Sequence, residues 1–473
     1  MPSSALNRSE KRATLTLASL YSLRMLGLFM ILPVFSLYAG ELAGVTPLLT
    51  GLAIGIYGLT QAVLQIPLGM LSDRIGRRPV IVGGLLIFAL GSVVAALADS
   101  IAMVIVGRAI QGAGAIAAAI MALAADLTRE EQRSKIMAAI GVSIGVSFVL
   151  SMILGPLLNH WVGVPGIFWI TAMLALAGIA MVHLGLPRSI VSRRRRDASA
   201  VPTELLGVLK DRQLLRIDLS IFSLHLLLTA CFVALPLALR DNVGVEAAQH
   251  PWIYGPVLVI AILLMVPFVI IAEAKRKMKP VVLAAVATIA VGLALMGAFA
   301  DSLTGIVVGL FIFFVAFNVL EATLPSWIAK EAPADKKGTA MGVYSSSQFL
   351  GAFVGGAAGG WIMGQWGAVA VFMVSAGLTL LWLALMIPMR SPRYCSSRLL
   401  PVTVASAAEA ALISDKLLAI DGVEEAVVII DDQVAYLKVD SRRLDEAALA
   451  AFKAQQVAQE DELAMASARM QCG

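Results

Sequence analysis

Four ionisable side chains lie well inside long apolar runs of the sequence: Arg24, Arg108, His225 and Glu321. A charge in hydrocarbon costs at least about 2.5 kcal/mol, so such groups normally face a water-filled cavity or pair with one another. We take Glu321 as the only acidic residue deep within such a run, which makes it the first candidate for a proton carrier. His225 is the second, because an unperturbed imidazole changes its charge near neutral pH.

Other interpretations of these four residues stay open. Glu321 could form a static ion pair with Arg24 or His225, or it could contact a substrate. His225 could equally be a structural histidine held by hydrogen bonds, and Arg108 could tie neighbouring helices together. At about 1.5 Å of rise per residue, Arg24 and His225 lie about 15 Å, and Glu321 about 10 Å, from the same side of the membrane. They could therefore face one aqueous cavity.

Uncharged polar residues occur in the same runs. Tyr57, Gln61 and Gln65 recur every four residues, so they form a stripe along one face of a helix. The candidates for the lining of a cavity or for substrate contact are Arg24, Tyr57, Gln61, Gln65, Gln111, Asn318 and Gln348. Hydrogen bonds between helices explain any one of them as readily as substrate contact does. The remaining lining would be Met, Phe and Leu, which favours amphipathic or lipophilic solutes.

The elements that must position these residues are membrane-spanning helices. Of 473 residues, 59% are hydrophobic and 14% are charged, against about 25% charged in an average soluble protein. The apolar runs of roughly 20 residues can cross a hydrocarbon core of about 30 Å as helices. This excludes a soluble enzyme, and the lack of alternating strands excludes an outer-membrane barrel. Twelve spans are expected, at 14–40, 48–71, 79–98, 101–124, 136–158, 166–186, 215–239, 252–272, 281–300, 303–328, 339–363 and 368–389.

Lysine and arginine lie almost entirely in the loops on one side of these spans. By the positive-inside rule that side is cytoplasmic, and it holds both termini and the central loop. After the basic run Arg193 to Arg196, Leu205, Leu206 and Leu209 follow at helical spacing, which predicts an amphipathic surface helix. The expected organisation is a first half (1–187), this linker (188–214), a second half (215–390), a short linker (391–398) and a cytoplasmic domain (399–473).

The loop from Gly69 to Pro79 carries a recognisable motif. Its residues Gly-Met-Leu-Ser-Asp-Arg-Ile-Gly-Arg-Arg-Pro resemble motif A of the major facilitator superfamily at every defined position. Arg108-x-x-Gln111-Gly112 resembles motif B of that superfamily. Gly155-Pro156 resembles the antiporter motif C, but Leu158-Asn159-His160 stands where its closing Gly-Gly is expected. Over nearly its whole length the chain is similar to bacterial twelve-span drug:proton antiporters that end in a small cytoplasmic domain.

The resemblance implies an all-α fold of two six-helix halves that rock around a central cavity. It also implies that Arg108 tunes proton release. The motif A residues would form a latch that holds the halves in an outward-facing state: Gly69, Asp73, Arg74, Gly76, Arg77 and Arg78, with Asp126 as a further carboxylate. On physical grounds, Gly69 allows close approach of the glycine-rich span 11, and Arg77 can make a two-pronged pair with Asp126. The alternative is a turn that holds topological charges only.

The C-terminal segment has the composition of a soluble domain. Strands are expected at 399–404, 423–430 and 434–439, and helices at 407–419 and 445–452, which is a ferredoxin-like βαββα order. From Leu399 onward there are thirteen acidic and six basic residues, so the segment carries −7 and the remainder +12. Opposite charges on one chain predict contact between this domain and the basic cytoplasmic loops. An acidic surface that only aids solubility is the alternative.

The sequence therefore predicts a multi-pass protein of the bacterial inner membrane that exports amphipathic or drug-like molecules in exchange for protons. The alternatives are a proton symporter or facilitator for a nutrient, and a non-transporting sensor that acts through its C-terminal domain. No cofactor, metal or nucleic acid is expected, and the cysteines Cys231, Cys395 and Cys472 are too far apart in sequence for a thiolate metal site. No catalytic set occurs within the spans, so we do not expect an enzyme.

Overall fold

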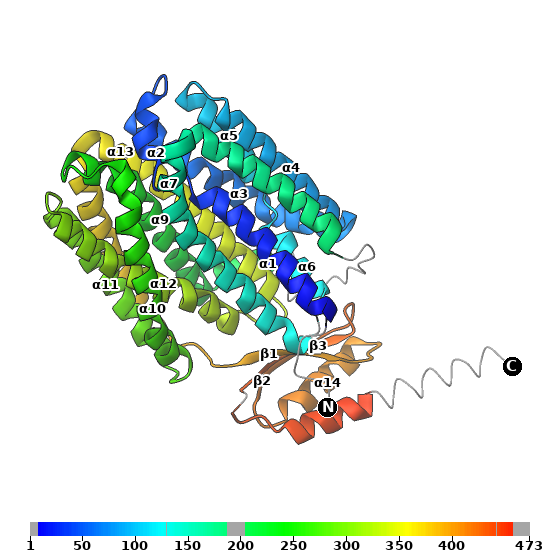
Figure 1. The fold of residues 1–473 in the computed structure, drawn as a ribbon. Coiled ribbons are helices and arrows are strands. Elements are labelled where there is room, and N and C mark those ends of the chain that lie inside the picture. The colour runs from blue at the N-terminus through cyan, green and yellow to red at the C-terminus, as the bar shows by residue number, and fades with distance from the viewer. Residues whose placement is uncertain (1–7, 129, 187–203, 441, 457–473) are drawn as a thin grey trace.

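The computed structural model describes residues 8–128, 130–186, 204–440 and 442–456. A long helical bundle is followed by a small α+β domain that lies against one end of it (Figure 1). We call the end of the bundle that contacts this domain the domain end, and the opposite end the far end. The N-terminal part of the bundle consists of α1 (Arg8–Phe29), α2 (Phe35–Tyr38), η1 (Ala39–Glu41), α3 (Pro47–Ile75), α4 (Arg77–Ala96), α5 (Ile101–Ala113), α6 (Ala117–Asp126) and α7 (Glu130–Gly185).

The second half follows a short helix in the linker. Its elements are α8 (Leu205–Lys210), α9 (Arg212–Asp241), η3 (Ala247–Gln249), α10 (His250–Glu273), α11 (Met278–Ala298), α12 (Leu303–Glu331) and α13 (Lys337–Met386). Polar side chains fix where several of these helices begin, because each accepts a hydrogen bond from a backbone N–H of the first turn. Thr46, Ser100, Asp211 and Ser302 cap α3, α5, α9 and α12 in this way.

The bundle contains the twelve expected spans. Nine helical stretches among the described residues are long and apolar enough to cross a membrane. Two of them, α7 and α13, break at Gly163 (φ 67°) and Gly367 (φ 78°), and each therefore supplies two spans. Glycine adopts such positive φ angles readily, which allows a tight turn between consecutive spans. The helix α1, which packs along α7, completes the set.

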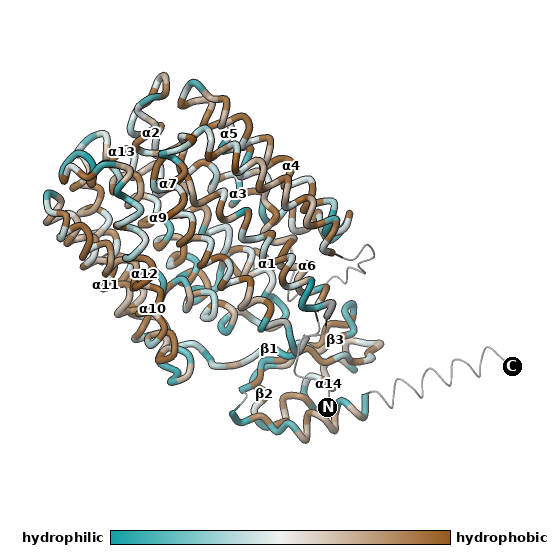
Figure 2. Tube along the Cα trace, in the orientation of Figure 1, coloured by the Kyte–Doolittle hydropathy of each residue, from teal (hydrophilic) through white to brown (hydrophobic). Residues whose placement is uncertain are grey.

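Hydrophobic residues predominate along the helices of the bundle (Figure 2), and many large apolar side chains on them are exposed, as a lipid solvent requires. Tryptophans gather at the far end, where Trp161, Trp252, Trp361 and Trp366 are 69%, 80%, 49% and 61% exposed. Trp361 and Trp366 also contact each other edge to face, with ring centroids 5.2 Å apart. Tryptophan is enriched at the boundary between hydrocarbon and water, so this belt marks where the far end leaves the membrane.

Two elements differ from the prediction. Span 1 was expected to run to residue 40, but α1 ends at Phe29, four residues before Pro33, and a proline ring crowds the carbonyl of the fourth residue before it. Span 4 was expected to be continuous, but it breaks between α5 and α6 at 114–116.

The predicted linker helix is present as α8. It is six residues long and buries Val208, while Leu206 and Leu209 are 68% and 46% exposed, as in an amphipathic helix at a membrane surface. Residues 188–203, with the basic run Arg193 to Arg196, lie outside the described residues.

The two halves pack closely through α3 and α13 at the far end. A Cβ added to Gly51 would overlap the carbonyl oxygen of Gly356, and one added to Gly55 would lie 2.8 Å from the carbonyl oxygen of Phe353. Gly360 approaches the start of α3 in the same way, at the Pro47 carbonyl oxygen. Glycines permit this backbone-to-backbone contact because they carry no side chain. At this end of the bundle the two halves are therefore in backbone-to-backbone contact.

The C-terminal domain is a three-stranded antiparallel sheet packed against helices. The strands β1 (Ser396–Pro401), β2 (Val423–Ile429) and β3 (Val434–Val439) have the order β1-β3-β2. The helix α14 (Ala407–Leu418) and a helix at 446–456 pack on the sheet, with Leu417, Ala435 and Leu437 in the core. The order of elements is that of the predicted βαββα unit, although β1 begins three residues earlier and ends at Pro401.

Polar contacts hold this domain against the bundle. Arg276, in the turn between α10 and α11, binds both carboxylate oxygens of Asp440 at 2.7 and 3.2 Å. The Lys438 ammonium donates to the Lys330 carbonyl at 2.6 Å. In the linker before β1, the Tyr394 hydroxyl accepts from the Met278 N–H at 2.9 Å and donates to a carbonyl of α10. The contact thus joins a basic loop of the second half to the acidic domain.

Candidate functional site

Three side chains from three helices of the second half meet in the middle of the bundle. The Gln348 amide nitrogen on α13 lies 2.8 Å from His225 Nε2 on α9 and donates to Glu321 Oε1 on α12 at 3.3 Å. The other ring nitrogen, His225 Nδ1, lies 3.3 Å from the Ile221 carbonyl oxygen. An amide N–H donates to Nε2 only if that nitrogen carries a lone pair, which places the ring proton on Nδ1.

This hydrogen-bond pattern has a chemical consequence. His225 Nε2 and Glu321 Oε2 are 3.9 Å apart, and Glu321 Oε2 has no hydrogen-bond partner among the described residues. The amide of Gln348 stands between imidazole and carboxyl. A proton added at His225 Nε2 would exchange the bond from Gln348 for an ion pair with Glu321, so one proton can rearrange contacts among three helices. The Glu321 side chain as a whole is 36% exposed, against 9% for His225, although its Oε2 atom is buried.

The polar residues of the first half form a separate chain of hydrogen bonds. Arg24, which is 2% exposed, donates to the Tyr57 hydroxyl at 2.6 Å and to Gln61 Oε1 at 2.5 Å. Gln61 in turn donates to Gln65 at 3.0 Å. The stripe on α3 therefore binds Arg24, and no ion pair joins Arg24 to Glu321 or His225 in the described structure. Two of the guanidinium nitrogens, Nε and Nη1, keep unused donors.

Arg108 ties neighbouring helices together. It donates to the carbonyls of Ala53 and Ile54 on α3, each at 3.3 Å, and to Gln111 Oε1 at 3.0 Å. The Gln111 amide nitrogen in turn donates to the Ser92 hydroxyl of α4 at 2.7 Å. The guanidinium carbon also lies 5.3 Å from the centre of the Tyr57 ring. These contacts fit the structural alternative considered for Arg108.

The motif A residues form a buried ionic cluster within the first half. Arg77, 4% exposed, pairs with Asp73, and its Nε lies 3.2 Å from Asp126 Oδ2. Its Nη1 donates to the Ser72 hydroxyl at 2.6 Å. The cluster therefore ties the start of α4 to α3 and α6. Arg78 donates to the Val182 carbonyl at 2.7 Å, and Arg74, in the last turn of α3, is exposed.

The glycines of this loop serve different purposes. Gly76 has a φ of 97°, which lets the chain turn from α3 into α4. A Cβ at Gly69 would lie 3.2 Å from the Ala118 side chain on α6, and nothing from span 11 is within 4 Å. The expectation that Gly69 meets span 11 is wrong, because the glycines of span 11 approach α3 nearer the far end.

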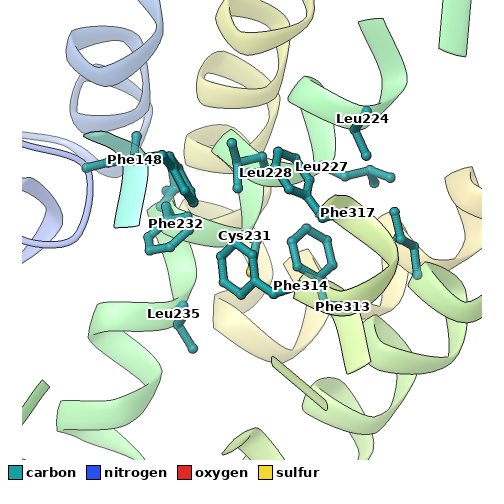
Figure 3. Close-up of a cluster of buried hydrophobic side chains, with 14 of the residues drawn as sticks. Phe148, Leu224, Leu227, Leu228, Cys231, Phe232, Leu235, Phe313, Phe314 and Phe317 are labelled. Carbon is teal, nitrogen blue, oxygen red and sulfur yellow. The ribbon is translucent and has the colours of Figure 1, made fainter. Parts of the chain in front are cut away.

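Phe148, Phe232, Phe314 and Phe317 belong to one buried aromatic cluster (Figure 3). The Phe317 ring centre is 6.0 Å from that of His225, and Phe148 of α7 is stacked on Phe317 at 6.2 Å. Phe314 lies 6.0 Å from Phe148, and Phe232 extends the cluster along α9. Rings from both halves therefore meet in one apolar contact between α7 and α12. The sequence analysis noted only that phenylalanine would line the cavity.

A second buried acidic group was not predicted from the sequence. Asp218 lies six residues after the start of α9 and is 3% exposed, so Glu321 is not the only buried carboxyl in the spans. Tyr344, on α13 one turn before Gln348, is also 3% exposed. Asp218 was visible as a charge near the edge of span 7. Asn318, one turn before Glu321, has a buried amide nitrogen without a partner among the described residues.

The sequence matches the profile of the Major Facilitator Superfamily over residues 17–356 and 219–394. The chain belongs to the major facilitator superfamily. It is 48% identical over 433 residues to the inner membrane transport protein YajR of Escherichia coli K12, which covers 92% of this chain and 95% of that protein. It is 27% identical to the multidrug resistance protein MdtH of Aeromonas salmonicida, over 71% of this chain and 84% of the relative.

Solved structures agree with this assignment. A bacterial homologue of the human lysosomal transporter Spinster, solved in an inward-facing and occupied conformation, has a TM-score of 0.65 at 14% identity. The match covers 81% of this chain and 97% of that chain, and it shows a common fold. The protein is therefore a membrane transporter, and its family and relatives are transporters, not enzymes. Within the described ranges, no three His, Cys, Asp or Glu side chains are grouped as metal ligands.

Proposed function

We propose that this protein is a proton-coupled antiporter that exports amphipathic or drug-like molecules by alternating access. The observation that carries the proposal is the cluster of Glu321, Gln348 and His225. It brings a carboxyl and an imidazole together through one amide, on three helices of the same half. Ionisable groups inside the membrane cost free energy, and those that are kept there typically mark an ion or substrate path.

The proposed cycle follows from the contacts. A proton that arrives at Glu321 neutralises the carboxyl and weakens its hold on Gln348 and His225, so α9, α12 and α13 can shift relative to one another. Because α13 also forms the glycine contact with α3, a shift of α13 reaches the gate at the far end. A solute and a proton that compete for the same state of this cluster are exchanged rather than carried together.

The proposed substrate class rests on the aromatic cluster. Phe148, Phe314 and Phe317 offer apolar ring faces next to the polar groups at His225 and Glu321, which suits a solute with both apolar and polar parts. The likeness to a multidrug resistance protein supports export of such compounds. Arg24, with its two unused donors, is the proposed polar contact in the first half.

We place the domain end in the cytoplasm and the protein in the bacterial inner membrane. The basic loops gather at the domain end, and that side is cytoplasmic by the positive-inside rule. Both termini then lie in the cytoplasm. The printed name of the relative from Escherichia coli supports the location. Protons would enter from the far side and leave toward the C-terminal domain.

A binding measurement tests the coupling directly. Purified protein in weakly buffered solution is titrated with a panel of amphipathic compounds while the pH of the solution is recorded. Antiport predicts that a bound solute displaces a proton from wild-type protein and none from the Glu321→Gln variant. Proton uptake on solute binding would favour a symporter. Binding without any proton change would favour a facilitator or a sensor.

The motif A cluster, whose contacts in this structure lie within the first half, is proposed to bind the second half as well in the outward-facing state and so to stabilise that state. Arg77→Ala leaves Asp73 and Asp126 as two buried carboxylates without their arginine, a change that costs about 3–5 kcal/mol in comparable ion pairs. We expect the variant to shift toward inward-facing states and to lose most of its transport. Labelling of single cysteines from each side of the membrane measures the shift. Arg74→Ala, at an exposed position of the same motif, is the control, and unchanged labelling and flux in Arg77→Ala would contradict the latch.

The C-terminal domain is proposed to bias the rocking of the halves through its contact with the α10–α11 turn. The bonds from Arg276, together with the backbone N–H of Arg442, lower the pKa of Asp440 to about 2. A lowered pKa stabilises the docked form at every pH above the ordinary aspartate value of about 3.9 and loses that contribution as the pH falls through about 2. Docking is therefore expected to be constant between pH 5 and 9 and to weaken with salt.

Cys395, partly buried in the linker before β1, reports this docking. With Cys231 and Cys472 replaced by alanine, Arg276→Glu is expected to raise the rate of maleimide labelling at Cys395 several-fold. The exchanged pair Arg276→Asp with Asp440→Arg should restore the slow rate. Lys275→Glu makes the same charge change at the neighbouring exposed residue and should have little effect. Equal labelling in all variants would show that this ion pair does not hold the domain.

A further inference from the structure

Asp218 and Tyr344 form a second polar site that the proposed cycle does not yet use. Both carboxylate oxygens of Asp218 and the Tyr344 hydroxyl are buried, and none has a hydrogen-bond partner in the described part of the chain. Buried polar groups are normally hydrogen-bonded, and exceptions concentrate where an ion, a proton or water is bound in part of the working cycle. Both groups lie in the bundle interior, where lipid offers no partner either.

The placement of the two residues connects them to the Glu321 cluster. The helices α9 and α13 both start at the domain end and run side by side. Asp218 and His225 are seven residues apart, on one face of α9 and separated by about 10 Å along it. Tyr344 and Gln348 are four residues apart, on one face of α13. Tyr344 and Asp218 therefore both lie on the domain-end side of the Glu321 cluster, and the carboxyls of Asp218 and Glu321 are both near enough to act electrostatically on the tyrosine hydroxyl.

The surroundings of Asp218 contain no basic partner. No ion pair joins it to Lys210 of α8 or to another basic side chain in the described ranges, and Asp211 at the start of α9 instead caps its own helix. The charge of Asp218 acts on the Tyr344 hydroxyl of α13, and so does that of Glu321 from α12. On the next face, the Ser220 hydroxyl accepts from Trp382 Nε1 at 3.1 Å, which fixes the orientation of α9.

We propose that Asp218 is a second proton-binding carboxyl, linked to Glu321 through the Tyr344 hydroxyl, on the route by which protons leave toward the domain end. Glu321 is ten residues from the end of α12, about 15 Å by helical rise, whereas Asp218 is about 9 Å from the start of α9. Asp218 thus lies between Glu321 and the domain end. In the transfer, Glu321 gives its proton to the tyrosine oxygen while the tyrosine passes its own to Asp218, so the tyrosine is unchanged.

This inference deepens the proposed antiport and rests on it for the direction of proton flow, but Asp218 can be tested without a substrate. Infrared difference spectra of full-length protein in lipid bilayers, recorded between pH 5 and 9, report the carbonyl stretch of protonated carboxyl groups. Asp218→Asn should remove one titrating band, and Glu321→Gln a different one. Tyr344→Phe, which deletes a single oxygen atom, should keep the Asp218 band and shift its frequency.

The matched control for the tyrosine is Tyr254→Phe. Tyr254 is equally buried, but its hydroxyl lies 3.5 Å from His250 Nδ1 at the far end, so this change should leave both bands in place. If Asp218→Asn and Tyr344→Phe give the wild-type spectrum, the proposal is overturned. If Asp218→Asn does not fold, Tyr344→Phe alone decides, since an unshifted band would show that the tyrosine does not contact the carboxyl.

A flux measurement separates this inference from the proposed function. Ethidium efflux from proteoliposomes is recorded with and without an imposed pH gradient. We expect Asp218→Asn to lower gradient-driven efflux at least tenfold and to keep ethidium exchange within twofold of wild type. Wild-type protein without gradient-driven efflux would contradict the antiport with ethidium while the infrared result for Asp218 stands. Full gradient-driven efflux in Asp218→Asn would remove this carboxyl from the proton route.

Discussion

Glu321→Gln is expected to reduce pH-driven transport to the level of protein-free liposomes while solute exchange continues. Glutamine has the same shape as glutamate and can still hydrogen-bond to Gln348, but an amide does not bind and release a proton in this pH range. The solute can then still move in both directions across the membrane. Only the link between solute and proton is lost.

The measurement compares two fluxes in one preparation: uptake driven by an imposed pH gradient, and exchange of labelled solute at equal pH. Glu246→Gln makes the same chemical change in an exposed loop at the far end and should leave both fluxes unchanged. Loss of exchange as well would point to substrate contact by Glu321. Full gradient-driven flux would transfer proton binding to His225 or Asp218.

The second large effect is expected at the glycine contact between the halves. In Gly356→Ala the new methyl group would overlap the Gly51 carbonyl oxygen, a backbone atom that no side-chain movement can displace. Overpacking of a tight contact costs about 1–3 kcal/mol. If this cost falls on the state with a closed far end, the population of that state drops about 5- to 150-fold. Transport should fall accordingly, because the cycle needs that state.

Gly377→Ala is the matched control, since it adds the same methyl group to the same long helical element at a position with nothing within 4 Å. A single cysteine at Thr50, which is buried in α3, reports opening of the far end to a membrane-impermeant thiol reagent. We expect faster labelling in Gly356→Ala and no change in Gly377→Ala. Equal labelling in both variants would show that these glycines do not form the gate.

Most of the fold could be predicted from the sequence because lipid imposes a strong constraint. In lipid, the backbone N–H and C=O groups of a span must be hydrogen-bonded within its own helix. Apolar runs of about 20 residues therefore predict the spans directly. The errors occurred where backbone detail overrides hydropathy. Pro33 ends α1 early although the run continues to residue 40, and the chain breaks at Gly114 within one apolar run.

The polar site was less accessible to sequence reasoning. Glu321, His225 and Gln348 could be selected because each is polar in an apolar run, but only the packing of α9, α12 and α13 shows that they touch. Arg24 was expected near Glu321, yet it binds Tyr57 and Gln61, because the stripe on α3 faces α1 in its own half. Depth along a helix can be counted from sequence, whereas the direction in which a side chain points depends on the neighbouring helices.

Charges near span ends were the weakest part of the prediction. Asp218 lies only a few residues inside its span, and hydropathy alone treats such a residue as part of the surface. The helix α9 packs against α13, and Gly351 of α13 approaches the backbone of Phe222, one turn after Asp218. The Gly69 expectation failed for a related reason: a small residue permits close approach but does not say which helix approaches.

The measurement that tests the central claim most directly uses wild-type protein in proteoliposomes loaded with amphipathic compounds, ethidium among them, with and without an imposed pH gradient. The account predicts that acid outside the vesicles drives a compound out against its own concentration gradient, and that collapsing the pH gradient with an ionophore stops this movement at once. Efflux at the same rate with and without the gradient, or accumulation of the compound together with protons, would contradict proton antiport.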